Sequence, residues 1–233
     1  MPGPRLRVGI FGGFLDKRFE QAGHTVVPIQ QPGDITQVDL VVVGPVGVEE
    51  TVVKLVPFIR PGQMVLHTAL EFGVQVLDPL ETEGAIVMAA HNFFDDVWVT
   101  SAADEVGEAA VNVLITDLGE TAYPIEDHAR PMLEAVRMIR THESSLRIEA
   151  AKILTEALPD AKGITMKYYF SVAPPDATRE DPESLDRMYA AIKDPQLRKA
   201  FVDLMWLSVH QGSIGTEPAL WALDKQSEFG PLD

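Results

Sequence analysis

The stretch from Arg5 to Val27 constrains the fold of this chain more than any other part of it. It begins with a short apolar run that is rich in β-forming residues and ends on Gly12 and Gly13. A charged amphipathic segment follows, and after a further glycine comes a second apolar run typical of a strand. Strand, glycine turn, helix and strand in this order form a βαβ unit, which predicts a parallel sheet with ligands bound at its strand ends.

The glycine turn departs from the pattern that binds dinucleotides. That pattern, G-x-G-x-x-G, uses one glycine for the turn, one for close approach to the pyrophosphate and one for helix packing. Gly12 suits the first role, but no glycine stands at the two later positions, and Asp16 falls where a helix N-terminus would face phosphate. A carboxylate there repels a phosphate. The turn therefore supports the βαβ fold more strongly than it supports normal dinucleotide binding. The alternative is that the glycines only make a tight turn.

Strand-like and helix-like segments alternate up to about residue 125. Strands are expected at 39–43, 64–67, 85–90, 97–100 and 121–125, and helices at 48–59 and from about 104 to 118, with 71–80 ambiguous. From Glu126 onward the pattern becomes helical, and residues 126–160 contain no glycine. We therefore expect an α/β domain with a mostly parallel sheet over residues 1–125 and an all-helical domain over 126–233.

The helical half is expected to begin with a long amphipathic helix. Apolar residues recur in it at spacings of three and four, at Met132, Val136, Ile139, Leu146, Ala150, Ile153 and Ala157. Glu143 occupies one position of this stripe, and a carboxylate on a buried seam is costly unless it is paired or hydrogen-bonded. Since arginines lie within helical reach, Glu143 is either a paired structural or dimer-interface acid or, with His142 beside it, a substrate-facing residue.

Later helices carry clear start signals at Asp181-Pro182, at Asp194-Pro195 and at Thr216. Residues 163–178, which are apolar and aromatic and then proline-rich, separate them from the long helix. This break is compatible with an ordered crossing segment, a lid or part of an interface.

Composition limits the classes of function. The net charge of −16 argues against nucleic-acid partners and an anionic membrane surface. The absence of cysteine excludes disulfides, thiolate catalysis and cysteine–zinc sites, and no spaced histidine pair predicts a metal. Without a signal segment or a bilayer-length apolar run, a soluble cytoplasmic protein is expected.

Two of the six histidines are candidates for acid–base chemistry. His67 and His91 both stand at the expected carboxyl ends of strands, the edge where open α/β sheets bind ligands. The alternative is that each is a packed, hydrogen-bonded structural residue.

Several segments resemble the 6-phosphogluconate dehydrogenase-like superfamily, in which a Rossmann domain precedes a helical domain with a long first helix. The matching segments are RVGIFGG, FEQAGHTVV, DLVVVGPV, IRPGQMVLHTA and AIVMAAHNF, and the likeness covers roughly residues 5–158. The resemblance implies an NAD(P)-linked oxidoreductase that forms a homodimer through its helical domain. It also implies the cofactor-binding residues, which are Gly12, Gly13, Phe14, Gly44, Pro45 and Val46.

The chain also departs from that superfamily. Between Gly12 and the AGH segment it is about five residues shorter than usual, and the Lys and Asn that serve catalysis in the hydroxyacid members are absent. The residues after the second strand, 28–34, include no Arg or Lys to meet a 2′-phosphate, which favours NAD over NADP. Two functions remain open: an NAD(P)-dependent oxidoreductase of a small metabolite, or a non-catalytic ligand-binding or regulatory dimer that has lost cofactor binding.

Overall fold

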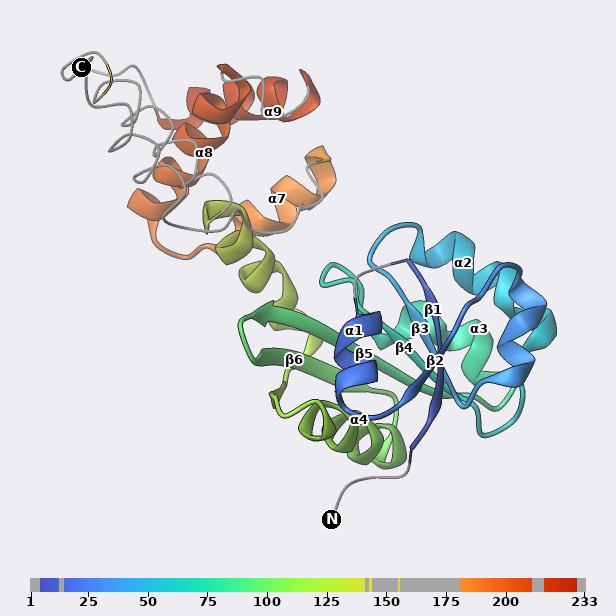
Figure 1. Cartoon of the computed structure of the whole chain (residues 1–233). Coiled ribbons are helices and arrows are strands. Elements are labelled where there is room, and N and C mark those ends of the chain that lie inside the picture. Colours follow the sequence, from blue (N-terminus) through green and yellow to red (C-terminus); the bar gives the residue numbers. More distant parts are fainter. Residues whose placement is uncertain are drawn as a thin grey trace. The chain divides into compact units, whose positions relative to one another are not determined.

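The structure is a computed structural model that describes residues 5–12, 15–140, 143, 155, 181–210 and 216–229. The chain divides into two compact units, Met1–Arg130 and Pro131–Asp233. Unit 1 is a layered α/β structure, and the described part of unit 2 is helical (Figure 1). The expected architecture, a mostly parallel sheet followed by a helical region, is therefore confirmed.

Unit 1 is built on one seven-stranded sheet of order β2-β1-β3-β4-β5-β6-β7. The strands are β1 (Arg7–Phe11), β2 (Thr25–Val27), β3 (Leu40–Val43), β4 (Met64–His67), β5 (Ile86–Phe94), β6 (Val97–Ala102) and β7 (Thr121–Pro124). The first five are parallel, β6 is antiparallel to β5, and β7 is parallel to β6. Only two residues join β5 to β6, and a parallel pair would need a crossover of a dozen or more.

Helices cover both faces of the sheet. They are α1 (Asp16–Gln21), α2 (Val48–Leu55), α3 (Asp78–Glu81) and α4 (Glu105–Asp117), with short 3-10 segments η1 (Pro32–Gln37), η2 (Val56–Phe58), η3 (Val74–Leu77) and η4 (Asp127–Ala129). The helix expected over 48–59 ends earlier, because Pro57 falls in a 3-10 turn that follows Leu55. The ambiguous segment 71–80 becomes η3 and the start of α3.

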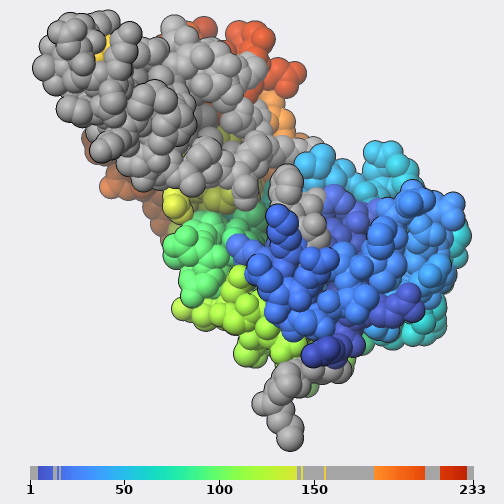
Figure 2. Space-filling view, in the orientation of Figure 1, coloured from blue at the N-terminus to red at the C-terminus, as the bar shows by residue number. Residues whose placement is uncertain are grey.

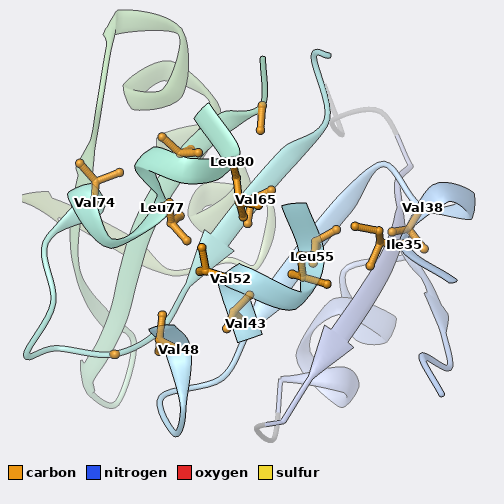
Figure 3. Close-up of a cluster of buried hydrophobic side chains, with 14 residues drawn as sticks. Ile35, Val38, Val43, Val48, Val52, Leu55, Val65, Val74, Leu77 and Leu80 are labelled. Atoms are coloured by element: carbon orange, nitrogen blue, oxygen red, sulfur yellow. The ribbon is translucent and has the colours of Figure 1, made fainter. Parts of the chain in front are cut away.

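One core lies between the sheet and the α2–α3 side. Figure 3 shows Val48, Val52 and Leu55 of α2 beside Val43 and Val65 of the sheet, all of them buried. The apolar spacing of α2 places these three side chains on one helical face. Because this face is buried, the first turn of α2 and the loop that precedes it are held at the edge of the sheet.

A second core fills the opposite face, under α1 and α4. Its buried members include Val8, Phe19, Leu40, Leu66, Met88, Trp98, Val111, Leu114 and Ile115. The continuous apolar runs of β3 and β4 are explained by these two cores, since a parallel strand in the middle of such a sheet is covered on both sides. Figure 2, drawn from the same side as Figure 1, shows that the amino-terminal segment (blue) forms much of this surface of unit 1.

A helix over residues 130–140 begins at the last residue of unit 1 and continues into unit 2. Unit 2 then contains α7 (Pro182–Ala191), α8 (Pro195–His210) and α9 (Thr216–Gln226), followed by η5 (Ser227–Phe229). The two expected aspartate caps are confirmed: Asp181 accepts from the backbone N–H of Ser184 at 3.0 Å, and Asp194 accepts from that of Leu197 at 2.8 Å. Among the described residues, no helix combines the length and apolarity needed to cross a membrane.

The expected buried stripe of the first helix is wrong in its first turns. Met132 and Val136 are exposed, whereas Ala135 and Met138 are buried in the core of unit 2 with Leu185 and other residues of α7, α8 and α9. The helix therefore presents a different face to its neighbours than its apolar spacing indicates. Residues 143 and 155 are also helical, but the rest of the expected helix and the break at 163–178 lie outside the described residues.

Candidate functional site

The carboxyl edge of the sheet has a switch point between β1 and β3. The chain leaves β1 to form β2 on one side and then returns to form β3 on the other, and open α/β sheets bind ligands at such a point. Phe11, Val43 and His67 occupy matching positions on β1, β3 and β4, so the residues after them share one edge. The glycine turn and one of the expected histidines are thereby brought together.

Two glycines make direct backbone contact at this switch point. The N–H of Gly44 donates to the carbonyl oxygen of Phe11 at 2.7 Å. A Cβ atom at position 44 would lie 2.5 Å from the carbonyl oxygen of Gly12, which is too close for any side chain. Gly12 itself has a φ of +67°, a conformation that glycine adopts without strain. The edge is therefore formed by bare backbone, which allows a ligand to approach closely.

The remaining expected cofactor residues fall into two groups. Pro45 and Val46 follow Gly44 and are exposed at the same edge, with 90% of Val46 accessible to solvent. Gly13 and Phe14 lie outside the described residues. The structure thus brings Gly12 beside Gly44, whereas the assignment of these residues to a cofactor stays a prediction.

Helix α1, which follows the glycine turn, is only six residues long, and Leu15 before it makes no side-chain cap. Arg18 of this helix forms a bidentate ion pair with Glu120, with Nη1 to carboxylate oxygen distances of 3.0 and 2.8 Å. Its guanidinium also lies 5.6 Å from the centre of the Trp98 ring, and the Trp98 indole N–H donates to the same carboxylate. Arg18 therefore anchors α1 to β6 and to the start of β7.

His67 is the last residue of β4, as expected, and it is fully buried. Its Nε2 atom lies 3.1 Å from the carbonyl oxygen of Gly73, so this nitrogen carries the ring proton. Within the described part of the chain, Nδ1 is buried and has no hydrogen-bond partner. Burial, reinforced by the nearby charge of Arg130, lowers the pKa of His67 from 6.5 to about 4. The ring is therefore neutral at physiological pH.

His91 does not end its strand, and the expectation that it does is wrong. Strand β5 continues to Phe94 because the hairpin to β6 extends it beyond the parallel pairing, which stops at His67 and Ala89. His91 still projects past the end of β4, where its Nδ1 donates to the carbonyl oxygen of Thr68 at 2.7 Å. This hydrogen bond assigns a ring proton to Nδ1.

Arg130 was not predicted as a site residue, and it is the centre of the polar cluster. It is 5% exposed and donates from Nε to Asp127 at 2.8 Å, from Nη1 to the carbonyl oxygen of Leu70 at 3.2 Å and from Nη2 to Ser101 Oγ at 2.5 Å. Although burial opposes it, the pKa of Asp127 is lowered by hydrogen bonds from Arg130 and Gln75. No spacing signal marks Arg130, because its partners are 3, 29 and 60 residues away.

The segment that follows β4, residues 68–73, is named here the β4 loop. Three of its carbonyl oxygens are held by three buried side chains: that of Thr68 by His91, that of Leu70 by Arg130 and that of Gly73 by His67. The Thr68 N–H also donates to Val43, next to Gly44, at 3.0 Å. This network fixes the β4 loop beside the switch point.

The two candidates from the helical half, Glu143 and His142, belong to unit 2. Glu143 lies in unit 2 and is exposed, so its expected position on a buried seam is wrong. His142 lies outside the described residues. Among the described residues, no group of three or more His, Cys, Asp or Glu side chains is arranged to hold a metal ion.

Comparisons with known proteins place this fold. No protein-family profile and no curated protein sequence matches the chain. Solved structures do match. Prephenate dehydrogenase from Aquifex aeolicus matches with 12% sequence identity and a TM-score of 0.54, over 95% of this chain and 97% of that one. The 3-hydroxyisobutyrate dehydrogenase from Mycobacterium tuberculosis matches with 13% identity and a TM-score of 0.50, over 97% of this chain and 94% of that one. A Bacteroides fragilis protein assigned as an NADP oxidoreductase also matches, with 13% identity and a TM-score of 0.55, over 96% of this chain and 97% of that one.

The chain has the fold of the 6-phosphogluconate dehydrogenase-like dehydrogenases. The resemblance of its sequence segments to that superfamily is thereby confirmed at the level of the fold. Identities of 12–13% carry no substrate from these proteins to this chain.

Proposed function

We propose that this protein is an NAD(P)-dependent oxidoreductase that acts on a small metabolite. One observation carries the proposal: the backbone contact between Gly12 and Gly44 at the switch point. In this class of sheet the switch point is where a dinucleotide lies, and a side chain at position 44 would push apart the two strand ends that form it. Pro45 and Val46 form the neighbouring part of the same surface, and Gly13 and Phe14 complete the proposed cofactor site.

NAD is the proposed cofactor in preference to NADP. The segment after β2, residues 28–34, carries no Arg or Lys that would bind a 2′-phosphate. Its one acid, Asp34, accepts the backbone N–H groups of Gln30 at 2.9 Å and Gln31 at 3.0 Å, and these hydrogen bonds lower its pKa. Asp34 thus supports the turn into η1, and the position offers no positive charge to a phosphate.

His91 is proposed as the residue that exchanges a proton with the substrate. Its Nδ1–H bond to Thr68 orients the ring, which a general base requires. His67 is proposed as a positioning residue, because a fully buried ring cannot touch a substrate. Glu143 and His142 are kept as proposed substrate-facing residues of unit 2.

A homodimer in the cytoplasm is also proposed, formed through unit 2. Met132 and Val136 lie four residues apart on one helix and are both exposed, which suits an apolar contact with a second copy. Light scattering after size exclusion should give twice the chain mass of 25.6 kDa. A single species with the mass of one chain would contradict the dimer.

The cofactor proposal is tested by thermal unfolding with NAD, NADH, NADP and NADPH, each at millimolar concentration. A bound cofactor raises the melting temperature by mass action, and a concentration of about a hundred times Kd adds about 2.7 kcal/mol to the unfolding free energy. We expect the larger shift with NAD or NADH. No shift with any of the four would contradict the proposal and would favour a ligand-binding or regulatory protein that no longer binds a dinucleotide.

A further inference from the structure

A pocket lies at the opposite end of the strands from the proposed cofactor site. It has a volume of about 260 Å³ and is lined by Leu6, His24, Met64, Ala109, Ala110, Val113, Leu114 and Asp117. Leu6 and His24 precede β1 and β2, and Met64 begins β4, so the pocket lies at amino-terminal strand ends. Helix α4 supplies its other wall. Neither the fold nor the proposed function accounts for it.

The short α1 helix explains why the sheet is uncovered here. Phe19 of α1 and Leu114 of α4 belong to the same core, so both helices cover the same face. A six-residue helix is about 9 Å long, whereas a five-residue strand such as β1 spans about 17 Å. Helix α1 therefore cannot follow β1 over its whole length, and it ends at Gln21, shortly before His24.

His24 places a hydrogen-bond donor at this apolar pocket. The backbone N–H of Leu6 donates to Nδ1 at 3.2 Å, so a ring proton is on Nε2. The side chain is 2% exposed, and Nε2 has no hydrogen-bond acceptor among the residues that the structure describes. A buried N–H without an acceptor is unfavourable, and a ligand atom that accepts from it is correspondingly stabilised.

Asp117 determines which kind of ligand atom fits. One of its carboxylate oxygens lies 3.7 Å from His24 Nε2, beyond hydrogen-bond distance but close enough for one atom to contact both groups. A carboxylate ligand would be repelled by Asp117, and an ammonium group offers no lone pair to the His24 N–H. A hydroxyl group satisfies both, because it accepts from His24 and donates to Asp117.

We propose that this pocket binds a small neutral alcohol, with the hydroxyl group between His24 and Asp117 and the apolar body against Leu6, Met64 and α4. The site is separate from the cofactor edge, so it is a second ligand site of unit 1. Its occupation does not depend on whether the protein binds NAD(P).

The proposal is tested with four ligands that share a ring and differ in one group: benzyl alcohol, toluene, benzylamine and benzoate. Each ligand is titrated into the protein in the absence of dinucleotide, and binding is followed by ¹H–¹⁵N NMR of the His24 imidazole. We expect benzyl alcohol to bind about tenfold more tightly than toluene, in line with one added hydrogen bond, and both charged ligands to bind less tightly than benzyl alcohol. Equal binding of toluene and benzyl alcohol, or no binding of either, would overturn the proposal.

Three variants locate the site. Ala110→Leu fills the pocket from α4 and is expected to abolish binding of benzyl alcohol, whereas Val106→Leu, on the same helix but outside the pocket lining, should retain it. Asp117→Asn removes the carboxylate and should reduce the preference for benzyl alcohol over toluene. Circular dichroism establishes that each variant is folded, and unchanged binding in folded Ala110→Leu would place the ligand elsewhere and refute the assignment.

Discussion

The fully buried imidazole of His67 donates from Nε2 to the carbonyl oxygen of Gly73 across 3.1 Å. A Cβ atom at position 73 would lie 2.6 Å from a carboxylate oxygen of Asp127, so a larger residue there would displace that side chain. Because the carbonyl can only accept, a second proton would have to go to the buried Nδ1 atom, near the positive charge of Arg130. This contact therefore ties the shape of the β4 loop to a neutral His67 ring.

Stability is expected to fall in mild acid because of His67. Its pKa is about 4 in the folded protein and 6.5 as an unperturbed group, so between these values the unfolded state binds the additional proton. The stabilisation is present above about pH 6.5 and is lost as the pH falls toward about 4. A difference of this size corresponds to about 3 kcal/mol in the free energy of unfolding.

Urea denaturation from about pH 7.5 to about pH 4.5 measures this loss. His67→Gln is the matched variant, since the Gln amide can still donate to Gly73 but does not titrate. Its free energy of unfolding should decline less over this range than that of the wild type. Both proteins have the same carboxylates, so the difference between them reports His67. Parallel curves for the two proteins would show that His67 does not titrate as described.

Arg130→Gln is expected to raise the pKa of His67. The guanidinium charge is one of the causes that lower this pKa, and a neutral amide removes it. The variant should also lose about 2 kcal/mol or more of stability, because Leu70 and Asp127 lose a charged donor in a buried place. NMR titration of the His67 ring shows whether its pKa rises in the variant. A pKa that stays the same or falls would contradict the role given to Arg130.

Gly44→Ala is expected to weaken or abolish the melting-temperature shift produced by NADH. The new Cβ would lie 2.5 Å from the carbonyl oxygen of Gly12, so the two strand ends must separate at the proposed cofactor site. Gly62→Ala is the control: that glycine has a positive φ, of +76°, which Gly44 does not, and it has open space around it. The control should lose about 1 kcal/mol of stability and keep the shift. Equal shifts in both folded variants would place the cofactor elsewhere.

Glu120→Ala is expected to destabilise unit 1 by about 1–3 kcal/mol, because it leaves the buried Trp98 indole N–H and Arg18 without their shared carboxylate. Trp98 fluorescence should shift to longer wavelength as the ring becomes hydrated. The comparison is Lys54→Ala, which breaks the exposed pair with Glu50 and should cost much less stability, because solvent screens such a pair. Similar losses in the two variants would show that the Arg18–Glu120–Trp98 contacts contribute no more than a surface ion pair.

The order of strands and helices could be predicted from the sequence because local pattern determines it. The apolar runs that form β3 and β4 and the aspartate caps of α7 and α8 are local signals, and all of them are found in the structure. The direction of β6 is not a property of its own residues, since it depends on the two-residue connection and on pairing with β5. The sequence pattern therefore identified the strand but not its orientation.

The candidate site was predictable only in part, for a similar reason. His67 and the glycines could be found because strand ends and glycine turns leave a trace in the sequence. The role of Arg130 could not be found, since it depends on a loop 60 residues earlier in the chain and on a neighbouring strand. The exposure of Met132 and Val136 was missed because the spacing of apolar residues does not determine which helical face meets a neighbour.

The β5–β6 hairpin has a consequence for how the sheet assembles. Its strands are separated by two residues, whereas each parallel pair must first close a loop of many residues, which slows nucleation. The hairpin is therefore the part of the sheet with the lowest contact order, and the parallel strands would add to it afterwards. Kinetic φ-values should be high at Ala90 and Val99 and close to zero at Val26 on the outermost strand.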